Sequence, residues 1–141
     1  METSNRILDD LMKEFSLPHV EERIPREVFY QLGLKFPQQY AIAARDVRSC
    51  VKRAEAVGAG PFLVATIPAP NWIERGQLIK DCKIELALGY AGDRQVEFLG
   101  PGEGTQHYAA ALEDTDVAFH HVGIYQKGME TIAPTLESRG Y

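Results

Sequence analysis

Apolar residues recur at helical spacing near the start of the chain and predict an amphipathic helix over residues 6–15. Ser4 or Asn5 stands where a side chain can cap the first turn of this helix. Prolines at 18 and 25 interrupt the pattern, so we expect residues 16–37 to be irregular apart from a short helix near 27–32. This helical N-terminal extension, residues 1–37, is expected to cover an apolar surface of the main body or of a partner subunit.

Residues 38–100 show short runs of small and branched residues that are typical of strands. The pattern predicts one helix, which begins after the capping residue Asp46 and ends at Gly58. Prolines predict a loop over 68–72. Gly92 and Asp93 have the chemistry of a hairpin turn, which would set Glu97 opposite Leu88. The predicted strands are residues 38–45, 62–67, 77–90 and 94–99.

Beyond a linker at 101–116, which includes a short predicted helix over 106–112, the pattern of the earlier unit returns. A strand is predicted over 117–125 and a helix with Pro134 inside it over 129–139. The two strand-then-helix stretches align at one constant offset, which pairs Gln39 with His121 and Gly58 with Gly140. The order of elements predicts an α+β fold with helices packed on one face of a mixed sheet. A repeat of this kind places equivalent positions around a local twofold centre.

The composition of the 141 residues is that of one ordinary globular domain, with 45% hydrophobic and 25% charged residues. The net charge of −5 and the lack of a basic cluster argue against a nucleic-acid partner. No apolar run is long enough to span a membrane, and the N-terminus lacks signal-peptide features. Cys50 and Cys82 form no CxxC pair, so we expect reduced, inert thiols and a cytoplasmic location.

Three segments in this order resemble the vicinal oxygen chelate superfamily, which includes glyoxalase I, extradiol dioxygenases, bleomycin-resistance proteins and methylmalonyl-CoA epimerase. They are Gly-Tyr-Ala-Gly-Asp-Arg-Gln-Val-Glu-Phe-Leu at 89–99, His-His-Val-Gly-Ile at 120–124, and Glu-Ser-Arg-Gly-Tyr at 137–141. Glu-Arg-Gly at 74–76 also suits the group. The likeness covers about residues 36–141 and is nearest to the glyoxalase-like proteins around the epimerase.

The resemblance implies paired βαβββ modules whose curved mixed sheet encloses a cavity. Residues 38–100 would be the first module, and 117–141 the strand and helix that begin an incomplete second one. It also implies a divalent metal (Mg, Mn, Co, Zn or Fe) held by Gln39, Glu97 and His121, with Glu97 doubling as a catalytic base. Members usually carry His where this chain has Gln39, and their fourth ligand lies in a strand that the sequence does not include.

The alternation of residues along the strands supports part of this site. Strand alternation sets Glu97 on the same face as Leu88, and an isolated carboxylate against such an apolar wall needs a partner, a proton or a metal. Tyr125 and Trp72 are further candidates, with Leu88, for contacts to a substrate.

Each of these residues also has an ordinary reading. Glu97 would then face solvent on an edge strand, and His121 would be a hydrogen-bonded core residue. Trp72 would be a loop aromatic or a core anchor. His120, on the face opposite His121 by simple alternation, is expected to be structural.

Two functions remain open at this point. One is a metal-dependent isomerase, lyase or dioxygenase acting on a small substrate with vicinal oxygens. The other is non-catalytic sequestration of a small molecule, as in bleomycin-resistance proteins. A third reading is a shortened relic whose remaining role is association. The strands expected of a complete second module would cover a sheet edge and an apolar cavity wall. Without them we predict a homodimer, in which the partner or the N-terminal extension covers that surface.

Overall fold

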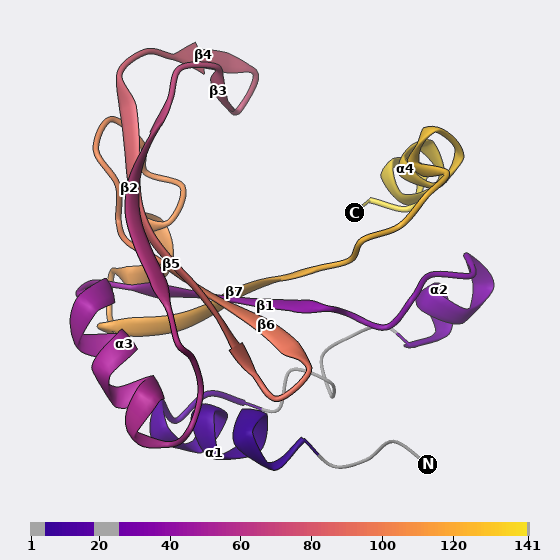
Figure 1. Cartoon of the computed structure of the whole chain (residues 1–141). Helices are drawn as coiled ribbons and strands as arrows, with labels where there is room; N and C mark the ends of the chain where they lie inside the picture. The colour runs from indigo at the N-terminus through magenta and orange to yellow at the C-terminus, as the bar shows by residue number, and fades with distance from the viewer. Residues whose placement is uncertain (1–4, 19–25, 141) are drawn as a thin grey trace.

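A computed structural model describes residues 5–18 and 26–140 of the chain. Within these residues it contains four α-helices, one short 3₁₀ helix and seven strands (Figure 1). The helices are α1 (Arg6–Glu14), α2 (Arg26–Gln31), α3 (Val47–Ala56), α4 (Met129–Ser138) and the 3₁₀ helix η2 (Ala109–Leu112). The strands are β1 (Gln39–Ala44), β2 (Leu63–Ala69), β3 (Trp72–Glu74), β4 (Gln77–Ile79), β5 (Cys82–Ala91), β6 (Arg94–Leu99) and β7 (Val117–Gly123).

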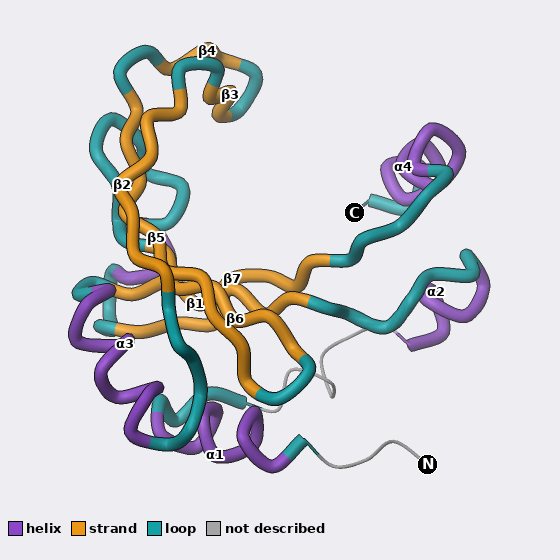
Figure 2. The backbone as a smooth tube through the Cα atoms, viewed as in Figure 1, coloured by secondary structure: helices purple, strands orange, loops and turns teal. Residues whose placement is uncertain are grey.

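Five of the strands form one mixed sheet in the order β2-β5-β6-β1-β7, and β3 and β4 form a separate hairpin. Strand β1 pairs in parallel with β6 and antiparallel with β7. The other pairs, β2 with β5 and β5 with β6, are antiparallel. Figure 2 shows β2 and β5 extending together out of the sheet as a long ribbon that ends near the small hairpin. The chain is therefore an α+β protein with a mixed five-stranded sheet.

One face of the sheet carries the larger core, which α1 and α3 cover (Figure 1). Alternate residues of β1 and β6 point into this core, and α1 adds a stripe of apolar side chains. Asn5 and Asp46 cap the two helices by accepting hydrogen bonds from the backbone N–H groups of Leu8 and Ser49. The predicted helix over 6–15 and both caps are thus confirmed, and α1 packs on the main body itself. Its buried residues are Leu8, Leu11, Met12 and, just after the helix, Phe15.

The opposite face of the sheet carries a smaller core built on the other set of alternate residues. Ala41 of β1 and Leu99 of β6 meet residues of β5 there, and Tyr108, just before η2, closes over them. Trp72 and Ile79 of the β3–β4 hairpin pack against the same cluster. This face is the one on which the sequence placed the candidate site, so we call it the site face.

Helices α2 and α4 lie together on the far side of the molecule from α1 and α3 (Figure 1). Neither contains a fully buried residue. The guanidinium of Arg139 donates a hydrogen bond of 2.9 Å to the side chain of Gln31, which links the two helices. Because they bury so little, they contribute far less to the fold than α1 and α3 do.

Several predicted boundaries were wrong for identifiable reasons. The strand predicted over 77–90 is split into β4 and β5, since Asp81 adopts a left-handed conformation with φ of 61°. Pro68 and Ala69 belong to β2 rather than to a loop, because β2 is an edge strand that tolerates a residue without an N–H. The helix predicted over 106–112 is only the short η2. The strand predicted over 117–125 ends at Gly123.

The hairpin turn at Gly92 and Asp93 is confirmed, and Glu97 pairs with Leu88 as predicted. The helix with Pro134 inside it is also confirmed as α4. Among the described residues no helix is long and apolar enough to cross a membrane. Ser4, Pro25 and Tyr141, which entered the sequence predictions, lie outside the described residues.

Candidate functional site

The three predicted metal ligands share the site face at the centre of the sheet. Ala41 of β1 is in register with Glu97 of β6 on one side and with His121 of β7 on the other. The Cα atoms of Glu97 and His121 are therefore about 10 Å apart, two strand spacings, with only a methyl group between them. Gln39 lies one pleat further along β1 on the same face. Long side chains on either side of a small residue can converge above it.

Strands β1 and β7 are equivalent strands of the two repeat units, and they pair with each other in a reciprocal register. Gln39 is equivalent to His121, and Ala41 is equivalent to Gly123. In the sheet Gln39 pairs with Gly123, and Ala41 pairs with His121. The two pairs are therefore equivalent to each other, because Gln39 corresponds to His121 and Gly123 corresponds to Ala41. A local twofold axis produces this reciprocal register. The axis would run between β1 and β7, beside the candidate site.

A β-bulge in β7 corrects the expectation for His120. The register shifts between Ala41 and Ile42, which pair with His121 and Phe119, so His120 is the extra residue. A bulge interrupts strict alternation and re-aims side chains. The His120 ring accordingly packs against Tyr108 of the site-face core, with ring centroids 4.9 Å apart. His120 therefore joins His121 on the site face rather than lying opposite it.

Aromatic rings form a continuous cluster along this part of the face. The His107 ring contacts the rings of Trp72, Tyr108 and His120 at centroid distances of 5.7, 4.9 and 4.9 Å. The His120 ring in turn lies 5.2 Å from that of His121. We call these five residues the ring cluster. It connects the small β3–β4 hairpin to β7 and borders the candidate ligands.

The Nδ1 atoms of His120 and His121 are 2.9 Å apart, so one ring donates a hydrogen bond to the other. Burial lowers the pKa of both rings, and neighbouring histidines lower them further, which favours neutral imidazoles. A hydrogen bond from His120 to the backbone of His107 opposes this effect on the pKa of His120. If the Nε2–H of His120 makes that bond, its Nδ1 accepts from His121. The Nε2 of His121 then keeps a free lone pair, as a metal ligand requires.

Glu97 is half-buried, and burial raises the pKa of its carboxyl above the ordinary value of 4.5. No hydrogen bond or ion pair from residues 5–18 or 26–140 offsets that burial. The charge of Glu97 contributes to the raised pKa of Tyr108, after the larger effect of burial on that phenol. A half-buried carboxylate without a partner is a common feature of binding and catalytic sites.

Gln39 and Tyr125 meet at Gln95, a residue that we did not select from the sequence. The side-chain N–H of Gln39 and the hydroxyl of Tyr125 both donate to the Oε1 atom of Gln95, at 2.9 and 3.0 Å. Strand alternation already placed Gln95 on the face of Glu97, and that signal was available. The ring of Tyr125 is otherwise 63% exposed.

A hollow of about 830 Å³ lies between the β3–β4 hairpin and the segment around η2. His107 of the ring cluster is part of its wall. Its rim holds the carboxylate of Glu74, which accepts hydrogen bonds from Thr105 Oγ1 at 2.6 Å and from the backbone N–H of Gln106 at 3.3 Å. The hydrogen bond from Thr105 is the main reason that the pKa of Glu74 is lowered. This volume is in the range of small-molecule sites.

Trp72 and Leu88, the other predicted substrate contacts, lie at different distances from the proposed ligands Glu97 and His121. Trp72 is half-buried in β3, where its indole N–H donates to Glu74 over 3.4 Å. Its packing on the site-face core favours the anchoring role, and it is two rings away from His121. Leu88 stands directly beside Glu97 on β5.

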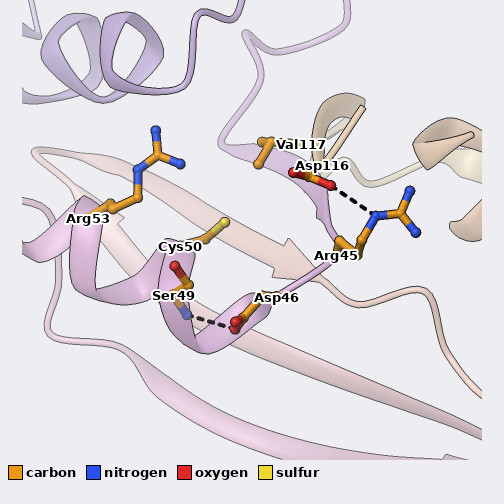
Figure 3. Close-up of a pocket in the computed structure, with 7 residues that line it drawn as sticks. All are labelled: Arg45, Asp46, Ser49, Cys50, Arg53, Asp116 and Val117. Carbon is orange, nitrogen blue, oxygen red and sulfur yellow. Dashed lines mark hydrogen bonds and ion pairs between the residues drawn. The ribbon is translucent and has the colours of Figure 1, made fainter. Parts of the chain in front are cut away.

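A second, smaller hollow of about 230 Å³ borders α3 and the start of β7 (Figure 3). Its charged groups are already paired, with Arg45 on Asp116 at 3.0 Å and Arg53 on Glu14 at 2.8 Å. Cys50 lies in its wall, and burial raises the pKa of that thiol to about 11, which keeps it protonated. Both cysteines are free and buried, as predicted.

In the described part of the chain, no three His, Cys, Asp or Glu side chains gather as a metal-binding group. The predicted ligand set is different, since it contains one carboxylate, one imidazole and the amide of Gln39. Amide and carboxylate oxygens with an imidazole suit Mg, Mn, Co, Zn or Fe(II) without selecting among them. No protein-family model matches the chain, and the search of curated proteins found no match either.

Replacing Glu97 by glutamine should stabilise the metal-free fold at pH 7.5. A raised pKa means that the folded state holds the proton more tightly than the unfolded chain, so ionisation of Glu97 removes stability as the pH rises through that pKa. Urea denaturation in the presence of a chelator should show Glu97→Gln more stable than wild type at pH 7.5, with the gap closing near the ordinary pKa of 4.5. Glu113→Gln, at an exposed position, is the control. Equal stability of Glu97→Gln and wild type at pH 7.5 would contradict the burial argument.

Proposed function

We propose that the chain is a glyoxalase-like protein of the vicinal oxygen chelate type, which holds a divalent metal and a small substrate with neighbouring oxygens on the site face. The observation that carries this proposal is the register at β1, where Ala41 separates Glu97 from His121. The reciprocal pairing of β1 with β7 supports the related proposal that residues 117–141 begin a second βαβββ module, which meets the first around that point. A cavity there would collect side chains from both modules.

The residues present fit a metal on three counts. Glu97 offers a carboxylate that no described residue pairs. His121 offers an imidazole whose Nε2 keeps a lone pair when its Nδ1–H donates to His120, and burial lowers the pKa of that imidazole. Ala41 stands between them with only a methyl group, so no bulky side chain of β1 separates Glu97 from His121, and Tyr108 packs over this part of the sheet. Gln39 would complete the set with an amide oxygen.

A bound metal would act as a Lewis acid toward a substrate that presents two adjacent oxygens. Glu97, when it is not coordinated, would act as the general base that takes a proton from the carbon beside those oxygens. Leu88 and the ring cluster would exclude water from one side of the reacting atoms. The hollow beside His107 offers room for the rest of the substrate. Isomerase, lyase and dioxygenase chemistry are all compatible with these roles.

Sequestration without chemistry is the second candidate. The ring cluster and the adjoining hollow favour it, because aromatic rings packed edge to face beside a hollow can bind planar molecules without any metal. The departure from histidine at Gln39 points the same way. Trp72 is the single tryptophan of the chain, so its fluorescence reports on ligands that reach this cluster.

We also propose a homodimer. Strand β7 is an edge of the sheet, and α4, which follows it, has no buried residue. Tyr125 and Met129 are 63% and 44% exposed beside that edge. A second copy would cover these apolar groups. Size-exclusion chromatography with light scattering should give twice the mass of one chain, and a monomer at every concentration tested would contradict the proposal.

Metal content separates the two candidate functions. Protein purified without chelator should contain near-stoichiometric metal. Glu97→Ala and His121→Ala each remove a proposed ligand, so each should weaken Mn²⁺ binding by at least the roughly 100-fold upper end of the range for outer-shell partners. Glu113→Ala, at an exposed position, is a matched control that removes a carboxylate but no proposed ligand. We expect this control to retain metal.

Absence of metal from wild type, with no thermal shift on adding Mn²⁺, Co²⁺, Zn²⁺ or Fe²⁺, would overturn the metal-dependent reading. Quenching of Trp72 by planar aromatic ligands, equal in wild type and Glu97→Ala, would then support sequestration.

A further inference from the structure

We propose that Gln95 is a positioning residue that directs the side-chain oxygen of Gln39, rather than its amide nitrogen, toward His121. The inference rests on the proposed function, because it explains how a glutamine can serve where a histidine is usual. It also gives Tyr125 a role that acts through Gln95.

Two hydrogen bonds join Gln39 and Tyr125 to the same atom of Gln95. The Oε1 atom of Gln95 accepts from Gln39 Nε2 at 2.9 Å and from the Tyr125 hydroxyl at 3.0 Å. A carbonyl oxygen has two lone pairs, so it can accept both bonds at once. With its N–H₂ group engaged on the β6 side, the amide of Gln39 has its oxygen on the other side.

Gly123 provides the space into which that oxygen turns. Gln39 stands on β1 between Gln95 of β6 and Gly123 of β7, in register with both. The Oε1 atom of Gln39 lies so close to Gly123 that a Cβ there would be 2.6 Å from it. His121 precedes Gly123 by two residues on β7, so the two residues lie on the same face of the sheet. The bulge at His120 lies before this stretch. The amide oxygen is thus on the same side of β1 as the imidazole.

Orientation matters because the two ends of an amide have opposite chemistry. The oxygen binds a hard cation, while the N–H₂ group donates hydrogen bonds and repels one. Residues that orient a metal ligand in this way typically change metal affinity by about 10- to 100-fold when they are replaced. Gln39 is a weak ligand to begin with, so the lower end of that range is expected.

Titration of Mn²⁺ into wild type, Gln95→Ala, Gln39→Ala and the Gln39→Ala/Gln95→Ala double variant tests the inference. Gln95→Ala should weaken binding about tenfold in the wild-type background and have no further effect once Gln39 is absent. Thermal melts of every variant check that each one is folded.

Three outcomes would overturn the inference. Unchanged Mn²⁺ affinity in Gln95→Ala, while Glu97→Ala loses the metal, would remove the role of Gln95 and leave the proposed function intact. An equal loss from Gln95→Ala in both backgrounds would show that Gln95 acts independently of Gln39. No Mn²⁺ binding by wild type would overturn the proposed function, and this inference with it.

Discussion

The pairing of β1 with a strand on each side is the constraint on which the candidate site depends. Strand β1 is parallel to β6 and antiparallel to β7, so three distant parts of the sequence meet in one row across the sheet. One face of β1 is held in the main core by Tyr40 and Ile42, both fully buried. A slip of one residue would send those side chains to the wrong face, at a cost of several kcal/mol in lost burial. The same register that protects the core therefore sets Glu97 and His121 on either side of Ala41.

Much of this arrangement follows from period-two alternation, which the sequence displays directly. The turn at Gly92 and Asp93 determined the partner of Glu97, because a two-residue hairpin fixes the register of the strands on either side. Helix α1 was equally visible from its apolar stripe and its cap at Asn5. These features are local, and each depends on residues only a few positions apart.

Features that depend on tertiary context could not be read in the same way. The bulge at His120 arises from the pairing of β7 with β1, and it reversed the predicted face of that histidine. Pro68 was excluded from a strand by a rule that holds for central strands, yet β2 turned out to be at the edge. His107 showed no partner in the sequence, since its neighbours Trp72 and His120 come from separate elements.

The site face brings a half-buried carboxyl close to two hydrogen-bonded histidines and a tyrosine. A carboxyl with a raised pKa stands near a tyrosine whose pKa its charge helps to raise, and two histidines share one proton between their Nδ1 atoms. Burial of the Glu97 carboxyl without a partner has a desolvation cost. Metal coordination would satisfy Glu97 and His121 at once, which is why we favour it over a purely aromatic pocket.

Crystals grown with Mn²⁺ would test the central proposal most directly through anomalous scattering. The account predicts one strong peak above Ala41, within bonding distance of the Glu97 carboxylate and the His121 imidazole. A peak elsewhere in the molecule, or none at saturating Mn²⁺, would contradict it.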